Sequence, residues 1–499
     1  MKFNNLINGR EFSLGQFVKV KSRFYPDYSS EIMNSTRLDL EKAVNSAVKS
    51  QEELNKLTFE DRKKIMTEVA KKLDFTEEDR EHCIKMIGLP RKRIDQYLNM
   101  ILGLLTAIPK AVESRFDIVG GKAGREYNDI NFVEIKVPES GFLYSVVPGN
   151  DPRATAFVAS FSVIAGIPAV LKISKNEVPI ATKFVKALIN AGYPTGAINL
   201  VLWDTSGKYS ERKHFFLCKK AKIVMPFGDD NTVEKLRYKQ INAVSAKVLL
   251  KNEGKQITKD FIEESQQKIK IDYFNNKALC HMTGNSAMIV TADADIDKII
   301  PILLYSAYHN PNSCQAAKGA YIDKEVYDEV MKKISDAAGK LKTGDPLDKE
   351  TDIGYVEDTT LTTVFNRVNT LQKFGQLVKK HGERTSNYQS SPLLLETMDH
   401  NSEFLMNEIA AYILTIKKCK GTHDLIASCN VAAERKPRLG ISIFTENRDS
   451  LNEFYEKLNA NLIHLNQPTN FWHGCIHYGF NYIESLSWTK SVYLGNKKV

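Results

Sequence analysis

The spacing of apolar residues changes near residue 141. Between residues 37 and 115, apolar residues recur three and four positions apart with charges between them, as in LDLEKAVNSAVKSQEELNKL and EDRKKIMTEVAKKLDF. This period is typical of amphipathic helices. Asp39 and Thr58 stand near expected helix starts, the latter in a TFED stretch that is similar to a capping box. The pattern predicts a helical N-terminal region over residues 1–120, which we interpret as scaffold or as the wall of a substrate channel.

From residue 141, short apolar runs alternate with longer helical stretches. The strand candidates are GFLYSVV, AVLKIS, AINLVLW and AKIVMPFG, and the helix candidates are ATAFVASFSVIAG, VPIATKFVKALINAG and DNTVEKLRYK. This alternation predicts βαβ units and a parallel sheet. Because such sheets bind ligands beyond the carboxyl ends of their strands, we expect a binding site in the loops at 147–153, 172–178, 203–208 and 226–232.

A second α/β stretch begins near residue 285. Its strand candidates are SAMIVTAD, GAYID, LGISIFTE and LIHLNQPTN, and its helix candidates are DADIDKIIPILLYSAYH, EVYDEVMKKISDAAGKL and RDSLNEFYEKLNA. Residues 340–400 are polar with several turn signals, which predicts irregular structure there. The fold class expected for the chain is therefore α/β, with two parallel sheets.

Composition narrows the class of protein. The chain has 499 residues, of which 42% are hydrophobic, and no apolar run reaches the ~18–20 residues that span a bilayer. The N-terminus lacks the apolar core of a signal peptide. The seven cysteines are scattered, and none has zinc-site spacing with other cysteines or histidines. We expect a cytoplasmic protein with free thiols, no metal and no membrane span.

The net charge of +9 has two interpretations. It either attracts anionic partners such as CoA, NADP or an acidic carrier protein, or it reflects a mildly basic, solvated surface. The lysines are spread along the chain and form no basic stripe, so we expect no nucleic-acid partner.

One cysteine stands in a polar loop, YHNPNSCQAAKGAYI at residues 308–322. The preceding helix is expected to end near His309, which places Cys314 in a loop or at the start of a new helical turn. Free backbone N–H groups there would lower the pKa of a thiol and hold an oxyanion. From the residues alone, Cys314 is a nucleophile or a buried structural cysteine.

Polar residues also follow three of the predicted strands. Asn150 in VVPGNDPRA offers a neutral donor for an oxyanion, or forms an ordinary asparagine turn. Lysines at a strand end suit ribose hydroxyls or a 2′-phosphate, or simply face solvent. Lys172 and Ser174 end the strand AVLKIS, and Lys175 adds a second cation. Gly228 in MPFGDDN is a glycine at the end of another predicted strand.

The order of these pieces resembles the aldehyde dehydrogenase superfamily over roughly residues 125–495. In that superfamily they read P-W-N-F-P, K-P-S-E, F-x-G-S, E-L-G-G-K, a cysteine loop and E-E-I-F-G-P. The resemblance implies two parallel-sheet α/β domains and a small oligomerisation element, hence a homo-oligomer. The expected divisions are a dinucleotide-binding domain at 121–280 with a bridging segment at 125–140, a catalytic cysteine domain at 281–465, and a return or oligomerisation tail at 466–499.

The resemblance also implies roles for individual residues. Cys314 falls on the nucleophile and Asn150 on the oxyanion-hole asparagine. Lys172 and Ser174 fall on the contacts to the adenosine ribose, and Gly228 falls on the glycine turn near the pyrophosphate. Glu408 falls on the glutamate that holds the nicotinamide ribose.

Four positions depart from the superfamily pattern. The glutamate that activates the deacylating water falls on His281, which is either a proton shuttle or a packing histidine. The glutamate of K-P-S-E falls on Lys175, which favours NADP over NAD. The serine after the glycine turn falls on Asp229, and the phenylalanine after E-E-I falls on Ala410. Both changes affect how the cofactor would be held.

Within the superfamily, VVPGNDPRATAFVASFSVIAGIPAVLKIS and NPNSCQ look most like the LuxC-type acyl-CoA reductases. That likeness implies NADPH-dependent reduction of a fatty acyl thioester to the aldehyde. The expected partner is acyl-CoA or an acyl-carrying protein of the acyl-protein synthetase kind. The alternatives are a short-chain CoA-acylating aldehyde dehydrogenase and a non-catalytic acyl-transfer scaffold.

Overall fold

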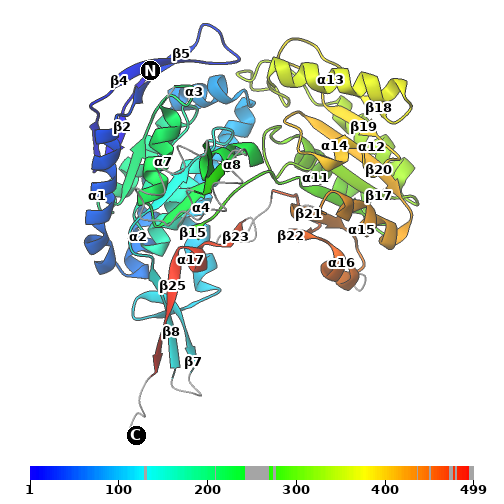
Figure 1. Ribbon diagram of the computed structural model, residues 1–499. Coiled ribbons are helices and arrows are strands. Elements are labelled where there is room, and N and C mark those ends of the chain that lie inside the picture. The colour runs from blue at the N-terminus through cyan, green and yellow to red at the C-terminus, as the bar shows by residue number, and fades with distance from the viewer. Residues whose placement is uncertain are drawn as a thin grey trace, which may run out of the picture.

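The computed structural model has two α/β lobes and a projecting arm of strands (Figure 1). It describes residues 1–127, 132–207, 209–241, 269–272, 277–434, 437–448, 451–470, 476–477 and 480–493. Parts of the predicted dinucleotide-binding domain and of the C-terminal tail, as well as position 208, lie outside the described residues.

The first lobe is built on a seven-stranded sheet in the order β15-β12-β9-β10-β11-β2-β3. Neighbours from β15 to β11 are parallel, whereas β2 joins β11 antiparallel. All residues of β9 to β12 except Val146 are buried, as expected for a sheet covered on both faces. The strands are β2 (Asn5–Ile7), β3 (Arg10–Phe12), β9 (Leu143–Val146), β10 (Ala169–Lys172), β11 (Ile198–Val201), β12 (Ile223–Pro226) and β15 (Lys277–Ala278).

Helices follow these strands as the sequence pattern predicts. They are α5 (Ala154–Ala165), α6 (Val178–Asn190), α7 (Ser210–Lys220) and α8 (Asp230–Arg237). The functional loops therefore leave the carboxyl ends of β9, β10 and β12 on one edge of the sheet. A separate antiparallel pair is formed by β13 (Tyr238–Ile241) and β14 (Ile269–Asp272).

The N-terminal region is helical only in part. Four helices match the predicted range: α1 (Arg37–Lys56), α2 (Phe59–Lys72), α3 (Glu77–Ile87) and α4 (Arg91–Glu113). Thr58 caps α2 in a capping box with Asp61, whereas Asp39 is the third helical residue of α1 and Thr36 is its cap. The expectation of a helical region is wrong for residues 1–34. They form β1 (Lys2–Phe3), β4 (Gln16–Lys21) and β5 (Ser29–Asn34) in a three-stranded sheet, and β2 and β3 in the first lobe.

The second lobe has a seven-stranded sheet in the order β18-β19-β20-β17-β16-β21-β22. It is parallel except for β18. The strands are β16 (Ala287–Val290), β17 (Gly319–Asp323), β18 (Val378–His381), β19 (Leu393–Glu396), β20 (Ile413–Cys419), β21 (Arg438–Phe444) and β22 (Ala460–Leu465). The helices are α11 (Ile296–Tyr308), α12 (Tyr327–Gly339), α13 (Asp358–Lys373), α14 (Glu403–Met406), α15 (Gly421–Val431) and α16 (Leu451–Lys457). Residues 340–400, expected to be irregular, contain α13, β18 and β19.

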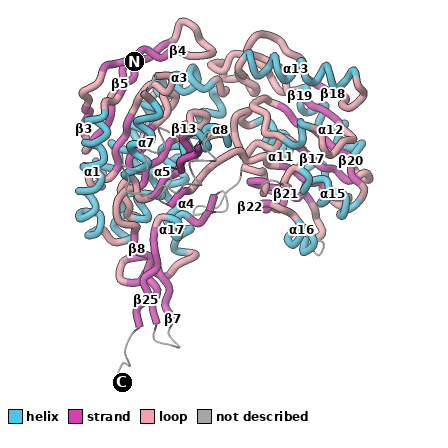
Figure 2. Tube along the Cα trace, viewed as in Figure 1, coloured by secondary structure: helices cyan, strands magenta, loops and turns pink. Residues whose placement is uncertain are grey.

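The arm projects away from both lobes (Figure 2). It is a four-stranded antiparallel sheet in the order β25-β8-β7-β6, in which Ser487 pairs with Pro138 and Tyr493 with Phe132. The strands are β6 (Asp117–Val119), β7 (Lys122–Tyr127), β8 (Phe132–Pro138) and β25 (Ser487–Tyr493); α17 (Tyr482–Ser485) precedes β25, and β23 (Ile476–His477) pairs with β24 (Phe480–Asn481). The segment and the tail expected to bridge subunits thus lie side by side. In the described part of the chain, no helix is long and apolar enough to cross a membrane.

Candidate active site

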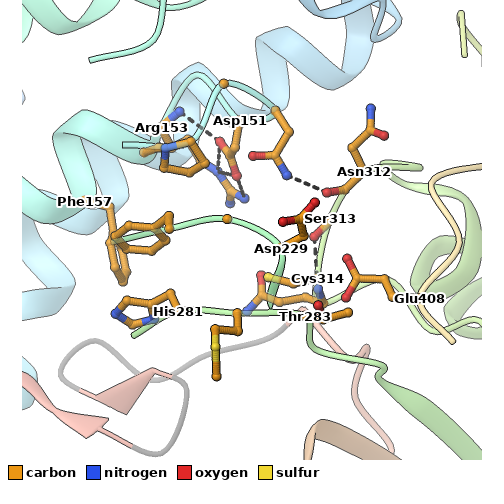
Figure 3. Close-up of a pocket in the computed structure, with 18 of the residues that line it drawn as sticks. Asp151, Arg153, Phe157, Asp229, His281, Thr283, Asn312, Ser313, Cys314 and Glu408 are labelled. Atoms are coloured by element: carbon orange, nitrogen blue, oxygen red, sulfur yellow. Dashed lines mark hydrogen bonds and ion pairs between the residues drawn. The ribbon is translucent and has the colours of Figure 1, made fainter. Parts of the chain in front are cut away.

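A cavity of about 570 Å³ lies where the loops of the two lobes meet. The first lobe contributes Asn150 after β9 and Gly228 after β12, and His281 follows β15; the second contributes Cys314 and Glu408. Figure 3 shows Cys314 between Glu408 on one side and His281 with Phe157 on the other. These five residues, together with Asp229 and Ala410, were singled out in the sequence and are brought together in one cavity.

Cys314 stands in a tight loop between α11 and β17. The backbone N–H groups of Ser313 and Ala316 donate to the carbonyls of Asn310 and Ser313, at 3.2 and 3.0 Å, which folds the loop into successive turns. The Cys314 side chain is partly exposed. On the other side of the loop, a Cβ at position 284 would lie 2.0 Å from the Cys314 carbonyl oxygen. Only glycine permits this close approach of two backbones.

Asn150 is tied to the cysteine loop by two hydrogen bonds. Its side-chain Nδ2 donates to the carbonyl of Asn312 at 2.5 Å, and its own carbonyl accepts from Nδ2 of Asn310 at 2.9 Å. The acceptor at Asn312 fixes which end of the Asn150 amide faces the loop. The second hydrogen of Nδ2 remains as a donor beside Cys314's loop. The turn itself is held by Asn176, whose Nδ2 donates to the Gly149 carbonyl at 2.7 Å.

His281, which the sequence resemblance places at the position of the deacylating carboxylate, is packed tightly. Its ring stacks on Phe227 with centroids 4.2 Å apart, and Nε2 is hydrogen-bonded to the Tyr482 hydroxyl at 3.1 Å. Burial lowers the pKa of His281 to about 3, so its ring is neutral at physiological pH. A ring with so low a pKa is a poor proton carrier near pH 7. This geometry favours a packing histidine over a proton shuttle.

Glu408 faces the cavity from the second lobe. Its Oε2 accepts from the backbone N–H of Gly284 at 2.6 Å and of Asn285 at 3.4 Å. Asn285 adopts a positive φ of 44°, and its Nδ2 donates to the Met406 carbonyl at 2.9 Å. The glutamate thus also braces the glycine turn that packs against Cys314.

Lys172, Ser174 and Lys175 lie at the carboxyl end of β10, beside the cavity rather than in its lining. Lys172 is only 7% exposed, and burial lowers its pKa to about 8. Its ammonium makes no hydrogen bond or ion pair with the residues that the structure describes. The Ser174 hydroxyl accepts from the Asn176 backbone at 3.2 Å. Burial, and then the charge of Arg23, lower the pKa of Lys175.

A nicotinamide dinucleotide fits this edge. The Lys172 Nζ lies 5.6 Å from the centroid of the Trp203 ring. A buried ammonium without a hydrogen-bond acceptor is nevertheless costly, and an oxygen-rich ribose would supply acceptors. Arg23, which the sequence did not single out, comes from the loop between β4 and β5 and adds positive charge near Lys175. Its ion pair with Glu357, directly before α13, connects the two lobes at this end of the cleft.

Gly228 and Asp229 form the turn into α8. The Gly228 N–H donates to the His281 carbonyl at 3.1 Å, and a Cβ at position 228 would press against Thr232 at 3.0 Å. The Asp229 carboxylate accepts from the Thr232 N–H at 2.6 Å. A carboxylate therefore caps the helix end where the pyrophosphate contact was expected.

Three further features were not found from the sequence. An Asp151–Arg153 ion pair lines the cavity, with the guanidinium stacked 4.0 Å over the Tyr97 ring. Tyr482 is fully buried, and burial, followed by the charge of Cys314, raises its pKa. Lys318 is fully buried beneath the cysteine loop. Of these features, only Lys318 could have been noticed in the sequence, because in QAAKGAYI it is a single charge among small residues before a predicted strand.

The described part of the chain contains neither a disulfide nor a cluster of side chains that could bind a metal ion. No disulfide includes Cys83, Cys218, Cys280, Cys314, Cys419 or Cys429 there. The same residues contain no group of three or more His, Cys, Asp or Glu side chains that could hold a metal ion.

Known proteins share both the sequence pattern and the fold. The chain is 22% identical over 471 residues to the D-glyceraldehyde dehydrogenase (NADP(+)) of Picrophilus torridus, covering 92% of this chain and 87% of that protein. It is 23% identical to the 1-pyrroline-5-carboxylate dehydrogenase of Bacillus subtilis, covering 86% and 77%. Neither relative is an acyl-CoA reductase by name, so the LuxC-type branch is not shown by them.

Solved structures agree on the fold. A 3,6-anhydro-L-galactose dehydrogenase superposes with a TM-score of 0.76 at 18% identity, covering 99% of this chain and 100% of that one. The lactaldehyde dehydrogenase of Escherichia coli superposes with a TM-score of 0.77 at 16% identity, covering 99% of each. A sequence model described as "Aldehyde dehydrogenase family" matches residues 13–259 and 254–481. The chain therefore belongs to the aldehyde dehydrogenase family and is an oxidoreductase of the NAD(P)-dependent aldehyde dehydrogenase type.

Proposed function

We propose that the protein reduces a fatty acyl thioester to the aldehyde through a thioester on Cys314. The observation that carries this proposal is the environment of His281. A thioacyl cysteine is discharged by water, which needs a base, or by hydride or another thiolate, which do not. The neutral His281 ring is stacked on Phe227 and hydrogen-bonded to Tyr482, and it is too weak a base to activate water near pH 7.

The other acids that line the cavity are already engaged. Asp151 is paired with Arg153, Asp229 caps α8, and Glu408 accepts backbone N–H groups of the glycine turn. An acid held by such partners is not positioned to activate a water beside Cys314. The described part of the site thus disfavours hydrolysis of the thioacyl cysteine.

In the first half-reaction, the Cys314 thiolate attacks the carbonyl carbon of the acyl thioester. Asn150 donates its second Nδ2 hydrogen to the oxyanion that develops. The bond between that carbon and the donor's sulfur then breaks, and the donor leaves as a thiolate that takes a proton from water. The donor thiol belongs to CoA or to an acyl-carrying protein. Because a thiolate is a good leaving group, no strong acid is needed at this step.

NADPH, when bound, would supply a hydride to the thioacyl carbonyl carbon. Lys172, Ser174 and Lys175 would hold its adenosine end, and Gly228 and Glu408 the end nearer Cys314. Asn150 can donate to the same carbonyl oxygen in this second half-reaction. The Cys314 thiolate then leaves as the carbon–oxygen double bond reforms, which releases the aldehyde and restores the enzyme.

Aldehyde oxidation is the second candidate, because the reported relatives are dehydrogenases of D-glyceraldehyde and 1-pyrroline-5-carboxylate. A short-chain CoA-acylating dehydrogenase and a scaffold that only transfers acyl groups are the remaining alternatives. Product analysis separates all four. Tetradecanoyl-CoA with NADPH should yield tetradecanal and CoA faster than acetyl- or propionyl-CoA is turned over. Formation of carboxylate from aldehyde and NADP⁺ without added thiol would instead show oxidation.

The arm supports a proposal about assembly. Its sheet stands away from both lobes and pairs the segment before β9 with β25 (Figure 1). Trp488 on β25 is 45% exposed. We propose that the arm joins copies of the chain into a homo-oligomer. Sedimentation should give a mass above 56.4 kDa for the whole chain, and Trp488→Glu should lower it.

A further inference from the structure

A lysine without solvent contact lies beneath the active site. Lys318, at the start of β17, is 0% exposed. Its Nζ donates to the carbonyl of Pro311 at 3.2 Å and to the carbonyl of Ala411 at 2.8 Å. Pro311 belongs to the loop that carries Cys314, and Ala411 follows the segment that carries Glu408. One side chain therefore connects the two parts of the second lobe that face the cavity.

Burying the Lys318 ammonium lowers the free energy of unfolding. Burial lowers the pKa of Lys318 to about 8, an effect opposed by the charge of Glu408. An apolar side chain of similar volume avoids the cost of burying an ammonium and often stabilises a protein. The two carbonyls would also find other partners or water if the loops were free to move. A cost of this kind is expected where a precise arrangement matters more than stability.

The remaining contacts close a ring around the nucleophile. Glu408 accepts from the Gly284 N–H at 2.6 Å. Gly284 in turn packs against the carbonyl of Cys314, and the Ser286 hydroxyl donates to that same carbonyl at 3.3 Å. The path thus runs from the cysteine loop through Lys318 to the Glu408 segment, and back through Gly284 to Cys314.

We propose that Lys318 is a positioning residue that sets the cysteine loop against the Glu408 segment. It acts through the carbonyls of Pro311 and Ala411 and touches no ligand in the cavity, because it has no exposed surface. The inference rests on Cys314 as the nucleophile, which the proposed function shares. It does not depend on whether the substrate is a thioester or an aldehyde.

The test compares Lys318→Met, which fills the space without donating, with Lys318→Gln, which keeps an amide donor. Lys324→Met, at an exposed lysine just after β17, is the control. The first readout is the rate at which iodoacetamide alkylates Cys314 in the folded protein, with Cys314→Ala as the blank. This readout needs no substrate, so it remains valid if the proposed thioester reduction fails. The second readout is kcat and KM with whichever substrate is turned over.

We expect Lys318→Met to lower both the alkylation rate and kcat about tenfold, with KM for the acyl donor changed less than about threefold. Lys318→Gln should lie between Met and wild type, and Lys324→Met should match wild type. If Lys318→Met does not fold, Lys318→Gln decides: a melting temperature near that of wild type with kcat lowered at least about threefold supports the proposal. Wild-type alkylation and kcat in the folded variant, or equal losses in Met and Gln, would overturn it.

Discussion

The side-chain nitrogen of Asn150 lies 2.5 Å from the backbone oxygen of Asn312, two positions before Cys314. The proposed oxyanion donor and the loop of the proposed nucleophile are therefore fixed to each other before any substrate arrives. Asn150→Ala removes this donor and should lower kcat about 10²- to 10³-fold, as loss of an oxyanion donor does elsewhere. Steady-state kinetics would measure it. Asn176→Ala, which removes a hydrogen bond to the neighbouring Gly149 carbonyl, should cost much less; an equal loss would mean that Asn150 only holds the turn.

His281 gives a prediction in which activity is gained. His281→Glu places a carboxylate at the position that the sequence resemblance assigns to the water-activating base. The variant should hydrolyse acyl-CoA slowly without any cofactor, because water can then discharge the Cys314 thioester. Release of free thiol and fatty acid would measure this. His281→Gln is the control and should leave reduction within about threefold of wild type, since a group with a pKa near 3 carries no proton at pH 7. Loss of reduction in His281→Gln would revive the role of a proton shuttle.

Substitution of Lys175 tests the proposed preference for NADPH over NADH. Burial, and then the charge of Arg23, lower the pKa of the Lys175 ammonium, and a 2′-phosphate would relieve the repulsion between the two cations. Lys175→Glu should therefore move the ratio of kcat/KM for NADPH over NADH towards NADH by at least about tenfold. The exposed Lys186→Glu on α6 serves as the control. An unchanged ratio in Lys175→Glu would remove this residue from the account of selectivity.

The buried histidines should make the folded protein less stable at acidic pH. Burial lowers the pKa of His281 to about 3, of His214 to about 3 and of His82 to about 4, against 6.5 in the unfolded chain. Between the folded and unfolded pKa values, the unfolded state binds more protons than the folded state. The free energy of unfolding is therefore not reduced by these histidines above pH 6.5, and it falls as the pH drops from 6.5 towards their folded pKa values. For His281 alone the loss at pH 5 is about 2 kcal/mol. The drop in melting temperature from pH 7.5 to pH 5 should be smaller in His281→Gln than in wild type; an equal drop would contradict the burial of a neutral ring.

The sequence was informative where the local pattern of apolar residues is clear. The strand and helix candidates from residue 141 onward match β9 to β12 and their helices because alternation and period are properties of short segments. In residues 1–34 the strand β2 was missed because a distant partner fixes it, Leu6 pairing with Leu200. The other strands there are two to six residues long and pair within the same segment, so they are too short to show a clear alternation. The helix α13 was hidden by its composition. Leu361, Val364 and Val368 do have helical spacing, but threonines and asparagines with poor helix propensity surround them.

Some residues of the candidate site could be found from the sequence, and others could not. Cys314, Asn150 and Glu408 were found because each stands in a motif of fixed order, and the fold brings them to one cavity. Lys318 and the Asp151–Arg153 pair were missed because their importance lies in contacts with other segments. The ionisation of His281 also depends on burial between aromatic rings, which no local pattern reveals.

Transfer of an acyl group to Cys314 is the most direct test of the proposed reaction. Incubation with tritiated tetradecanoyl-CoA, without cofactor, should label the protein with a hydroxylamine-labile adduct at Cys314. Adding NADPH should then release the label as tetradecanal. Cys314→Ala should take up no label, whereas Cys280→Ala and Cys429→Ala should be labelled as wild type. Absence of a labile adduct, an adduct that NADPH does not discharge, or loss of labelling in Cys280→Ala or Cys429→Ala in place of Cys314→Ala would contradict the account.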